Sequence, residues 1–516
     1  MSTTTTTIQL DQAPMGTQND GVLNRENPES PAEAVDSPAP LNSEKPPEFS
    51  TLAAECSFVC ICSMGQLLFA IYLASTFVTQ LALIEALQVS ESLVPWLIGS
   101  FLVANGVSVV IAGSLADLMS PKWLVIGAFV WSAAWNLVGV WSIDPSRLVL
   151  YLVVRAMLGL AVGTLCSAAM SMLGRVYRPG VRKNRVFSLM GAMIPMGVVV
   201  GALLGGALSA HLEWVFGSTA ILAAVCALLA CWCIPPLPVR SVGLRSFDFF
   251  GAAACVVGCG LVIFGLTQGE PTHWTPYTYA LVIVGVAFLG LFGFIESRVE
   301  RPLIDNRLWL TPGFLPLMIS YFLGYGGWVG SWQFYAVRFM LTIQGHSPII
   351  TACFLIPIGV FGALASWVVA RTLHIVPGHY ILIGSMIAFA LGPVFFLPQT
   401  SGTIYWALSF PGLSLTTFGP DMSFAAISIF ITSSVPKTYQ GAAGSFLITA
   451  QNLSTATMAA IGGTIASSAS QTGTAELDLN GYRAAWWFSL GVCLLAAVIC
   501  IAFVRIPKSE EKEHVS

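Results

Sequence analysis

Apolar runs of about 20 residues, separated by short polar segments, recur between residues 56 and 505. A helix needs about 20 such residues to cross roughly 30 Å of hydrocarbon. The pattern predicts about fourteen spanning helices, near residues 56–84, 93–116, 123–143, 148–173, 186–210, 214–236, 248–268, 277–297, 313–341, 349–371, 378–398, 403–433, 441–469 and 482–505. We therefore expect an all-α polytopic membrane protein.

Basic residues gather in alternate loops. One set of loops carries Lys122, Arg175, Arg178, Arg182, Lys183, Arg185, Arg240, Arg245, Arg298, Arg301, Arg307, Arg371 and Lys437, whereas the other set carries little beyond Arg147, Arg338 and Arg483. Because loops rich in lysine and arginine stay in the cytoplasm, we expect both termini to be cytoplasmic and the number of helices to be even.

Composition supports a membrane protein, since 56% of residues are hydrophobic and only 9% are charged. Residues 1–50 differ from the rest, with eight acidic and two basic residues. Such a segment buries too little apolar surface to fold, so residues 1–52 are expected to be a disordered acidic cytoplasmic tail, and residues 507–516 a second tail. The 12 cysteines lie mostly in apolar runs, which predicts neither a disulfide framework nor a metal site.

An internal repeat divides the chain. The segments "GTLCSAAMSM" and "GVVVGALLGG" are echoed by "GPDMSFAAIS" and "TATMAAIGG" after about 256 residues. We predict an N-terminal six-helix bundle at 53–240, two extra linker helices at 241–312 and a C-terminal six-helix bundle at 313–506. Parallel repeats of this kind are typical of transporters, although chance similarity between helices rich in small residues is the alternative.

Three motifs lie in the first half. The loop "GSLADLMSPKW" holds Asp117 at a helix C-terminus, where the macrodipole disfavours an anion, so Lys122 or the N-terminus of another helix should compensate. Arg155 lies inside a span, where a lone arginine is costly and needs a partner; pairing with backbone carbonyls would be a purely structural use. Gly197, Gly201 and Gly205 recur at four-residue intervals, followed by Gly206, which allows another helix backbone to approach closely.

Together these motifs resemble the major facilitator superfamily. Gly113, Asp117 and Lys122 match its gating signature, although Ser120 and Pro121 depart from it. "RAMLGLAVG" is similar to its intramembrane arginine motif, which implies proton transfer for Arg155. The glycine helix looks like the antiporter signature of drug exporters, with Ala202 where proline is usual.

A finer resemblance rests on the two extra helices and on "FDFFG", "ESRVERPLID" and "VPKTYQGAAGS". These segments look like the fourteen-helix drug:proton antiporter family. Within that family the chain is most similar to the fungal aminotriazole-resistance branch, which also contains boron and low-affinity ammonium transporters.

Polar and aromatic side chains mark a candidate substrate cavity. Tyr72, Thr76 and Gln80 lie on one face of a helix, and a polar stripe in a span should face the interior or a cavity. On another helix, Tyr325, Trp328, Trp332 and Gln333 could line a broad pocket beside several glycines. The alternative for the second set is an interfacial aromatic belt with glycines that only pack. Such a pocket would favour amphipathic organic molecules.

Asp421 lies near the middle of the run Phe410–Val435. A charge at the bilayer centre costs at least about 2.5 kcal/mol, so it is kept mainly where it functions. One interpretation is that Asp421 binds protons and faces Arg155 across a central cavity. The other is that Gly419 and Pro420 break the helix and Asp421 caps the restarted segment.

The sequence therefore predicts a secondary active transporter in the plasma membrane that exports a small organic molecule in exchange for protons. The alternatives are an importer, a transporter of a small inorganic solute such as borate or ammonium, and a nutrient sensor without flux. We expect no enzyme activity, cofactor or nucleic-acid partner. The expected partners are the substrate, protons and the lipid bilayer, and the expected state is a monomer.

Overall fold

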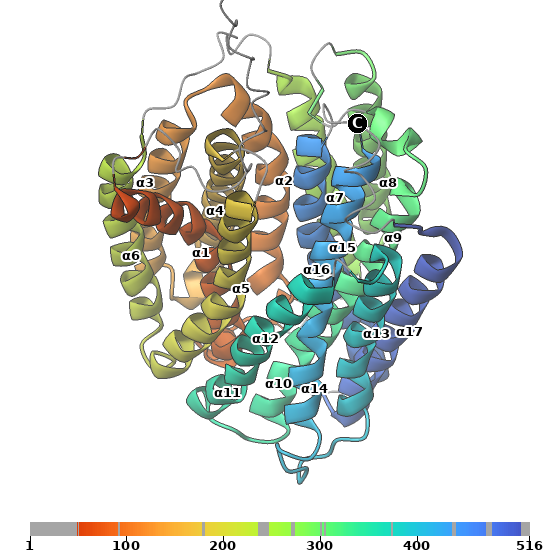
Figure 1. The fold of residues 1–516 in the computed structure, drawn as a ribbon. Helices are drawn as coiled ribbons and strands as arrows, with labels where there is room; N and C mark the ends of the chain where they lie inside the picture. Colours follow the sequence, from red (N-terminus) through yellow and green to blue (C-terminus); the bar gives the residue numbers. More distant parts are fainter. Residues whose placement is uncertain are drawn as a thin grey trace, which may run out of the picture. The chain divides into compact units, whose positions relative to one another are not determined.

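A computed structural model describes residues 49, 51–90, 93–177, 181–235, 247–269, 274–299, 302–303, 306–372, 375–435, 440–470 and 477–506. The described segments contain helices and turns but no strand. The predicted tail at 507–516 lies outside these residues, and so does nearly all of the tail at 1–52. Figure 1 shows the helices coloured along the chain.

The described part of the chain contains fourteen helical spans, which confirms the predicted fold class. Nine of these spans consist of one unbroken helix each: α1 (Leu52–Leu87), α2 (Trp96–Leu118), α3 (Pro121–Val140), α4 (Leu148–Val176), α5 (Val181–Ala207), α6 (Leu212–Cys233), α7 (Phe249–Gly269), α8 (Pro276–Glu296) and α13 (Gly378–Phe396). Two more, α16 (Gln440–Ala469) and α17 (Leu479–Phe503), are also unbroken. The remaining three spans are interrupted.

The interruptions occur at glycines and prolines. The first interrupted span is α9 (Phe314–Gly326), the π-helix η5 (Gly327–Gln333) and α10 (Phe334–Thr342); the others are α11 (Pro348–Phe354) with α12 (Ile356–Thr372), and α14 (Ser409–Thr416) with α15 (Phe418–Ser434). Pro357 and Pro420 follow the last two breaks. Since proline lacks the amide proton of a helical hydrogen bond, the continuous helices expected over 349–371 and 403–433 are each divided.

Twelve spans meet a combined criterion of length and mean hydropathy, so the chain is a multi-pass integral membrane protein. The span that contains η5 and the span α16 fall outside that criterion. The first is rich in Gly, Tyr and Trp, and the second is rich in Ser, Thr, Gly and Ala. Polarity in these two spans indicates that they face protein or an aqueous path more than lipid.

In the first half, α1 packs along α5 at backbone contact distance. A Cβ atom built at Gly197 would lie 2.6 Å from the carbonyl oxygen of Leu67, and one at Gly201 would lie 2.6 Å from the Cα of Ile71. Gly205 is similarly close to Ser75. The four-residue spacing on both helices therefore brings three successive turns together, and each contact excludes a larger side chain.

The two extra helices form a hairpin beside the junction of the two halves. Helix α7 contacts both α2 and α16, and Val107 of α2 shares a small apolar cluster with Cys255 and Cys259 of α7. Helix α8 packs on α7, and most of its surface remains exposed. In a bilayer that exposed apolar surface is in contact with lipid.

The two halves meet along two seams. At one seam α2 packs on α16, where the Thr449 hydroxyl donates a 2.6 Å hydrogen bond to the carbonyl oxygen of Gly106. At the other, α5 packs on α11 and α12, and a Cβ at Gly206 would lie 2.9 Å from Ala352. Gly206 therefore packs across the seam, unlike the three glycines that face α1.

Gly201→Leu should abolish transport, because the side chain cannot fit beside Ile71. Gly201→Ala should lower stability by about 1–3 kcal/mol, the usual cost of overpacking, and should be seen as a lower melting temperature of purified protein. Gly191→Leu on the same helix is the control, since a Cβ there meets nothing within 4 Å. Normal flux and melting in both Gly201 variants would refute the packing role.

Candidate functional site

Arg155 joins three helices of the first half. It lies on α4, and its guanidinium donates from Nε to the Leu97 carbonyl oxygen of α2 (3.3 Å) and from Nη2 to the Tyr72 carbonyl oxygen of α1 (3.2 Å). The cation also lies 4.9 Å from the centroid of the Phe101 ring. Arg155 is only 2% exposed. Among the described residues it forms no ion pair with a carboxylate, so backbone carbonyls and an aromatic face stabilise its charge.

Tyr72 points into the first bundle. Its hydroxyl lies 2.9 Å from the hydroxyl of Ser132 and accepts a 2.7 Å hydrogen bond from Asn136. Thr219 of α6 donates to the Asn136 side-chain oxygen at 2.9 Å. The Tyr72 hydroxyl therefore belongs to a buried polar network among α1, α3 and α6, while the backbone of the same residue accepts from Arg155.

Thr76 and Gln80 continue the Tyr72 stripe along α1. The Thr76 hydroxyl donates to the Tyr72 carbonyl oxygen, and the Gln80 side-chain nitrogen donates to the Phe77 carbonyl oxygen, each at 2.8 Å. Both side chains are buried. The Gln80 side-chain oxygen has no hydrogen-bond partner among the described residues, which leaves an acceptor for a substrate or water.

The aromatic side chains of α9 and η5 pack on α13. Trp328 stacks on Phe389 with ring centroids 5.1 Å apart, and Tyr325 meets both rings edge to face. Trp332 is fully buried and lies edge to face with Phe396. Gln333, the last residue of η5, is also buried. Because these side chains are buried and pack on one another, they form an aromatic wall inside the second half more than an exposed interfacial belt.

The side-chain amide of Gln451 binds the hydroxyl groups of two tyrosines at this aromatic wall. The Gln451 amide of α16 donates to the Tyr325 hydroxyl at 2.6 Å, and the Tyr321 hydroxyl donates to the Gln451 side-chain oxygen at 3.3 Å. Gln451 is half-buried. One amide thereby orients two tyrosines of α9, and Tyr325 lies within electrostatic range of Asp421.

Asp421 lies in the first turn of α15 and is half-buried. Its carboxylate accepts a 3.1 Å hydrogen bond from the Ser366 hydroxyl of α12. The N-cap residue of α15 is Thr417, one turn earlier, and its side chain makes no capping hydrogen bond. Asp421 and Arg155 contact different helices and share no hydrogen bond or ion pair in the described part of the chain.

Basic side chains near the loop that carries the gating motif bind the C-termini of neighbouring helices. Lys122 donates from Nζ to the carbonyl oxygens of Cys231 (3.0 Å) and Ile234 (2.6 Å), at the C-terminus of α6. Arg175 donates to the Ala116 carbonyl oxygen at the C-terminus of α2. Cations are favourable there because the macrodipole is negative at a C-terminus. Gly113 lies on α2, and the side chain of Asp117 is outside the described residues.

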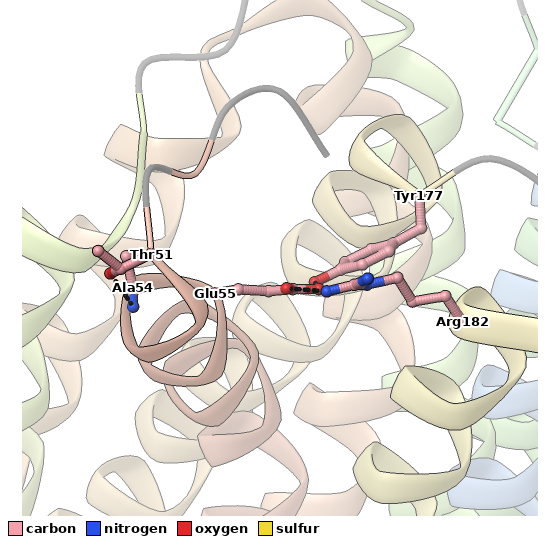
Figure 2. Close-up of polar contacts among 5 residues, drawn as sticks. All are labelled: Thr51, Ala54, Glu55, Tyr177 and Arg182. Carbon is pink, nitrogen blue, oxygen red and sulfur yellow. Dashed lines mark hydrogen bonds and ion pairs between the residues drawn. The ribbon is translucent and has the colours of Figure 1, made fainter. Parts of the chain in front are cut away.

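A buried polar cluster joins the start of α1 to the end of α4 and the start of α5 (Figure 2). Glu55 forms an ion pair with Arg182, whose Nε lies 2.8 Å from a carboxylate oxygen, and accepts a 2.9 Å hydrogen bond from the Tyr177 hydroxyl. Burial, and then the Glu55 carboxylate, raises the pKa of Tyr177, so its hydroxyl remains a donor at physiological pH.

Several of these residues were not predicted. Ser366, Gln451 and Phe389 contact the candidate residues, but nothing in their local sequence distinguishes them from ordinary helix residues. Gln451 carries one usable signal, since an amide inside a span usually faces the bundle interior. Glu55 and Arg182 are 127 positions apart, so their pairing depends on the fold.

Fourteen spanning helices in two packed halves, with buried polar side chains and a half-buried carboxylate, define a multi-pass membrane transporter. The model of the Major Facilitator Superfamily matches residues 60–457. The chain belongs to this superfamily.

Fungal relatives refine the assignment. The chain is 32% identical to the low affinity ammonium transporter of Saccharomyces cerevisiae, over 82% of each protein. It is 28% identical to efflux pump terJ of Aspergillus terreus, over 88% of each, and 27% identical to the aminotriazole resistance protein of Saccharomyces cerevisiae, over 88% of this chain and 85% of that protein. The resemblance to the fungal drug-transporter branch is therefore confirmed.

Solved structures share the fold. The human organic anion transporter MFSD10 superposes with a TM-score of 0.60 at 18% identity, covering 88% of this chain and 100% of that chain. At this identity the likeness supports the architecture alone.

Arg182→Ala should destabilise the protein by about 1–2 kcal/mol, because it removes two hydrogen bonds and a charge from the nearly buried Glu55 while Arg182 itself is partly screened by solvent. The melting temperature in detergent should fall. Arg371→Ala is the control, since that exposed cation lies over the Trp367 ring. Equal melting of the two variants would contradict the role of the cluster.

Proposed function

We propose that the protein exports small organic molecules in exchange for protons, as a monomer in the plasma membrane with both termini in the cytoplasm. Membership of the superfamily and the fungal efflux pump among the relatives support this function. Alternating access between two six-helix bundles provides the transport cycle. No cofactor enters this mechanism.

The position of Asp421 carries the proposal. The other acidic residues in the described spans lie near the ends of their spans, whereas Asp421 lies in the middle of the span Ser409–Ile431. Desolvation favours a neutral carboxyl group, and hydrogen-bond donors favour a charged one. A half-buried carboxylate with one hydroxyl donor can therefore take up a proton in one state of the cycle and release it in the other.

The contacts between the halves fit a state closed on one side. We call the side where α1 begins and α17 ends the terminal side. On the opposite side, the rings of Phe77 and Phe334 lie 5.8 Å apart, and Gly206 packs on Ala352. With Lys122, Arg175 and Arg182 on the terminal side, the charge distribution supports a cytoplasmic assignment for that side. In this proposal the closed side is extracellular.

Arg155 contributes a fixed charge to the mechanism we propose. Its two bonds to backbone carbonyls hold α1 and α2 beside α4. Tyr325, Trp328 and Gln451 supply a broad apolar wall with two polar atoms on the other half, which suits an amphipathic molecule.

A second candidate function is ammonium transport, which the relative at 32% identity favours. Substrate screening would separate the two functions. The protein would be expressed in a transporter-depleted yeast strain. If it is an exporter, the cells should gain resistance to organic toxins. If it takes up ammonium, the cells should instead grow better on limiting ammonium.

Asp421→Asn should abolish pH-driven export in proteoliposomes but preserve substrate binding and substrate exchange, because asparagine cannot titrate. Asp144→Asn is the control, since Asp144 is in a loop, where its carboxylate accepts a hydrogen bond from the Ser146 amide. Export of Asp421→Asn at the wild-type rate under a proton gradient would refute the coupling role.

A further inference from the structure

Helix α12 presents three small residues on one face and uses them for two different contacts. Gly359, Gly362 and Ser366 are spaced by three and four residues, so they lie along one side of the helix. The two glycines meet α5 of the first half. Ser366 meets Asp421 of the second half.

The contact with α5 is a close crossing that leaves no room for a side chain at either glycine of α12. A Cβ atom at Gly359 would lie 2.5 Å from a methyl carbon of Val199, and one at Gly362 would lie 2.9 Å from the Cβ of Pro195. Pro195 is inside α5. Proline removes one helical hydrogen bond and makes its position a natural point of bending. The fit is so close that α5 cannot shift toward α12 at this crossing without displacing it.

The same turn of α12 touches the break before Asp421. The Cβ position of Gly362 is also 3.3 Å from the methyl carbon of Thr417, the residue between α14 and α15. One turn further along α12, the Ser366 hydroxyl donates to the Asp421 carboxylate at 3.1 Å. The crossing and this hydrogen bond are thus separated by about 6 Å along the helix axis.

We infer that Ser366 is a positioning residue for the proton-binding carboxylate, and that the crossing of α5 over Gly359 and Gly362 controls its hydrogen bond to Asp421. The inference rests on the proposed function. When the first half rocks, α5 displaces α12, the hydroxyl leaves the carboxylate, and the neutral form is favoured. When the halves return, the bond reforms and the carboxylate releases its proton.

Other groups near Asp421 do not replace this donor. From α9, the titratable group that interacts electrostatically with Asp421 is Tyr325, whose hydroxyl already accepts from Gln451 of α16. From α13, Ser385 donates to the Gly419 carbonyl oxygen. On α12 the nearest cation in sequence is Arg371, which is exposed and lies over Trp367. Ser366 is thus the donor that a movement of α12 changes directly.

Ser366→Ala tests the positioning role. Loss of one hydrogen bond to a charged group should move the pH of half-maximal proton-driven export upward by about one unit, while substrate exchange without a gradient continues. Ser366→Thr retains the hydroxyl and should restore the wild-type profile. Ser218→Ala is the matched control, because that hydroxyl donates within its own helix.

Gly362→Ala tests the crossing. The added methyl group should displace Pro195 or Thr417, lower the export rate at least tenfold and shift the pH profile in the same direction as Ser366→Ala. Gly491→Ala on α17 is the control, since a Cβ there meets nothing within 4 Å. Melting temperatures of both variants identify any loss of folding.

The outcomes separate the inference from the proposed function. Wild-type protein without proton-driven export would overturn the proposed function itself. Proton-driven export in the wild type, with an unchanged pH profile in Ser366→Ala, would overturn the inference alone. A shift in Ser366→Ala that Ser366→Thr reverses, together with the same shift in a folded Gly362→Ala variant, would support both.

Discussion

Hydrocarbon offers no hydrogen bonds, so every polar group inside the spans needs a partner within the protein. This constraint explains how the chain places its cations. Arg155 binds two backbone carbonyls, and Lys122, Arg175 and Arg483 each bind carbonyl groups near the C-terminus of a neighbouring helix. Charges used in this way join helices to one another. Asp421 differs, because among the described residues the donor to its carboxylate is a neutral hydroxyl, that of Ser366, and this environment supports the proton-binding role that we propose for it.

Helix α5 makes close contacts on two faces. Helix α5 lays three glycines against α1, and each is enclosed by backbone atoms within its own half. Its other face meets α11 and α12 across the seam. There the glycines belong mainly to α12, and the α5 side presents Val199 and Pro195. Val199 and Pro195 occupy the space where side chains of Gly359 and Gly362 would lie, so α5 is packed as closely against α12 across the seam as it is against α1 within its own half.

Sequence reasoning predicted the spans because hydropathy and helix length are local properties. It also singled out Asp421 and Arg155 as candidates, since a charge in an apolar run is conspicuous, and their roles in proton coupling stay predictions. Orientation was harder to predict. Tyr72 lies on a polar stripe that could face a cavity or the bundle interior, and the partners Ser132 and Asn136 appear only after the bundle is assembled. Ser366 gave no signal, because a serine in a helix usually bonds to its own backbone.

The two halves have the same arrangement of helices, but different interactions stabilise them. His379 at the start of α13 bonds to Ile506 after α17, as Lys122 at the start of α3 bonds to the end of α6. The corner joined by Glu55 and Arg182 in the first half is occupied in the second by aromatic contacts among Trp309, Phe314, Phe430 and Phe446. An ion pair thus stabilises this corner of the first bundle, whereas ring packing stabilises the corresponding corner of the second. The ion pair depends on how far its charges are shielded from water, whereas the aromatic contacts depend on buried apolar area and ring geometry, so one helix arrangement is stabilised at the two corners by different interactions.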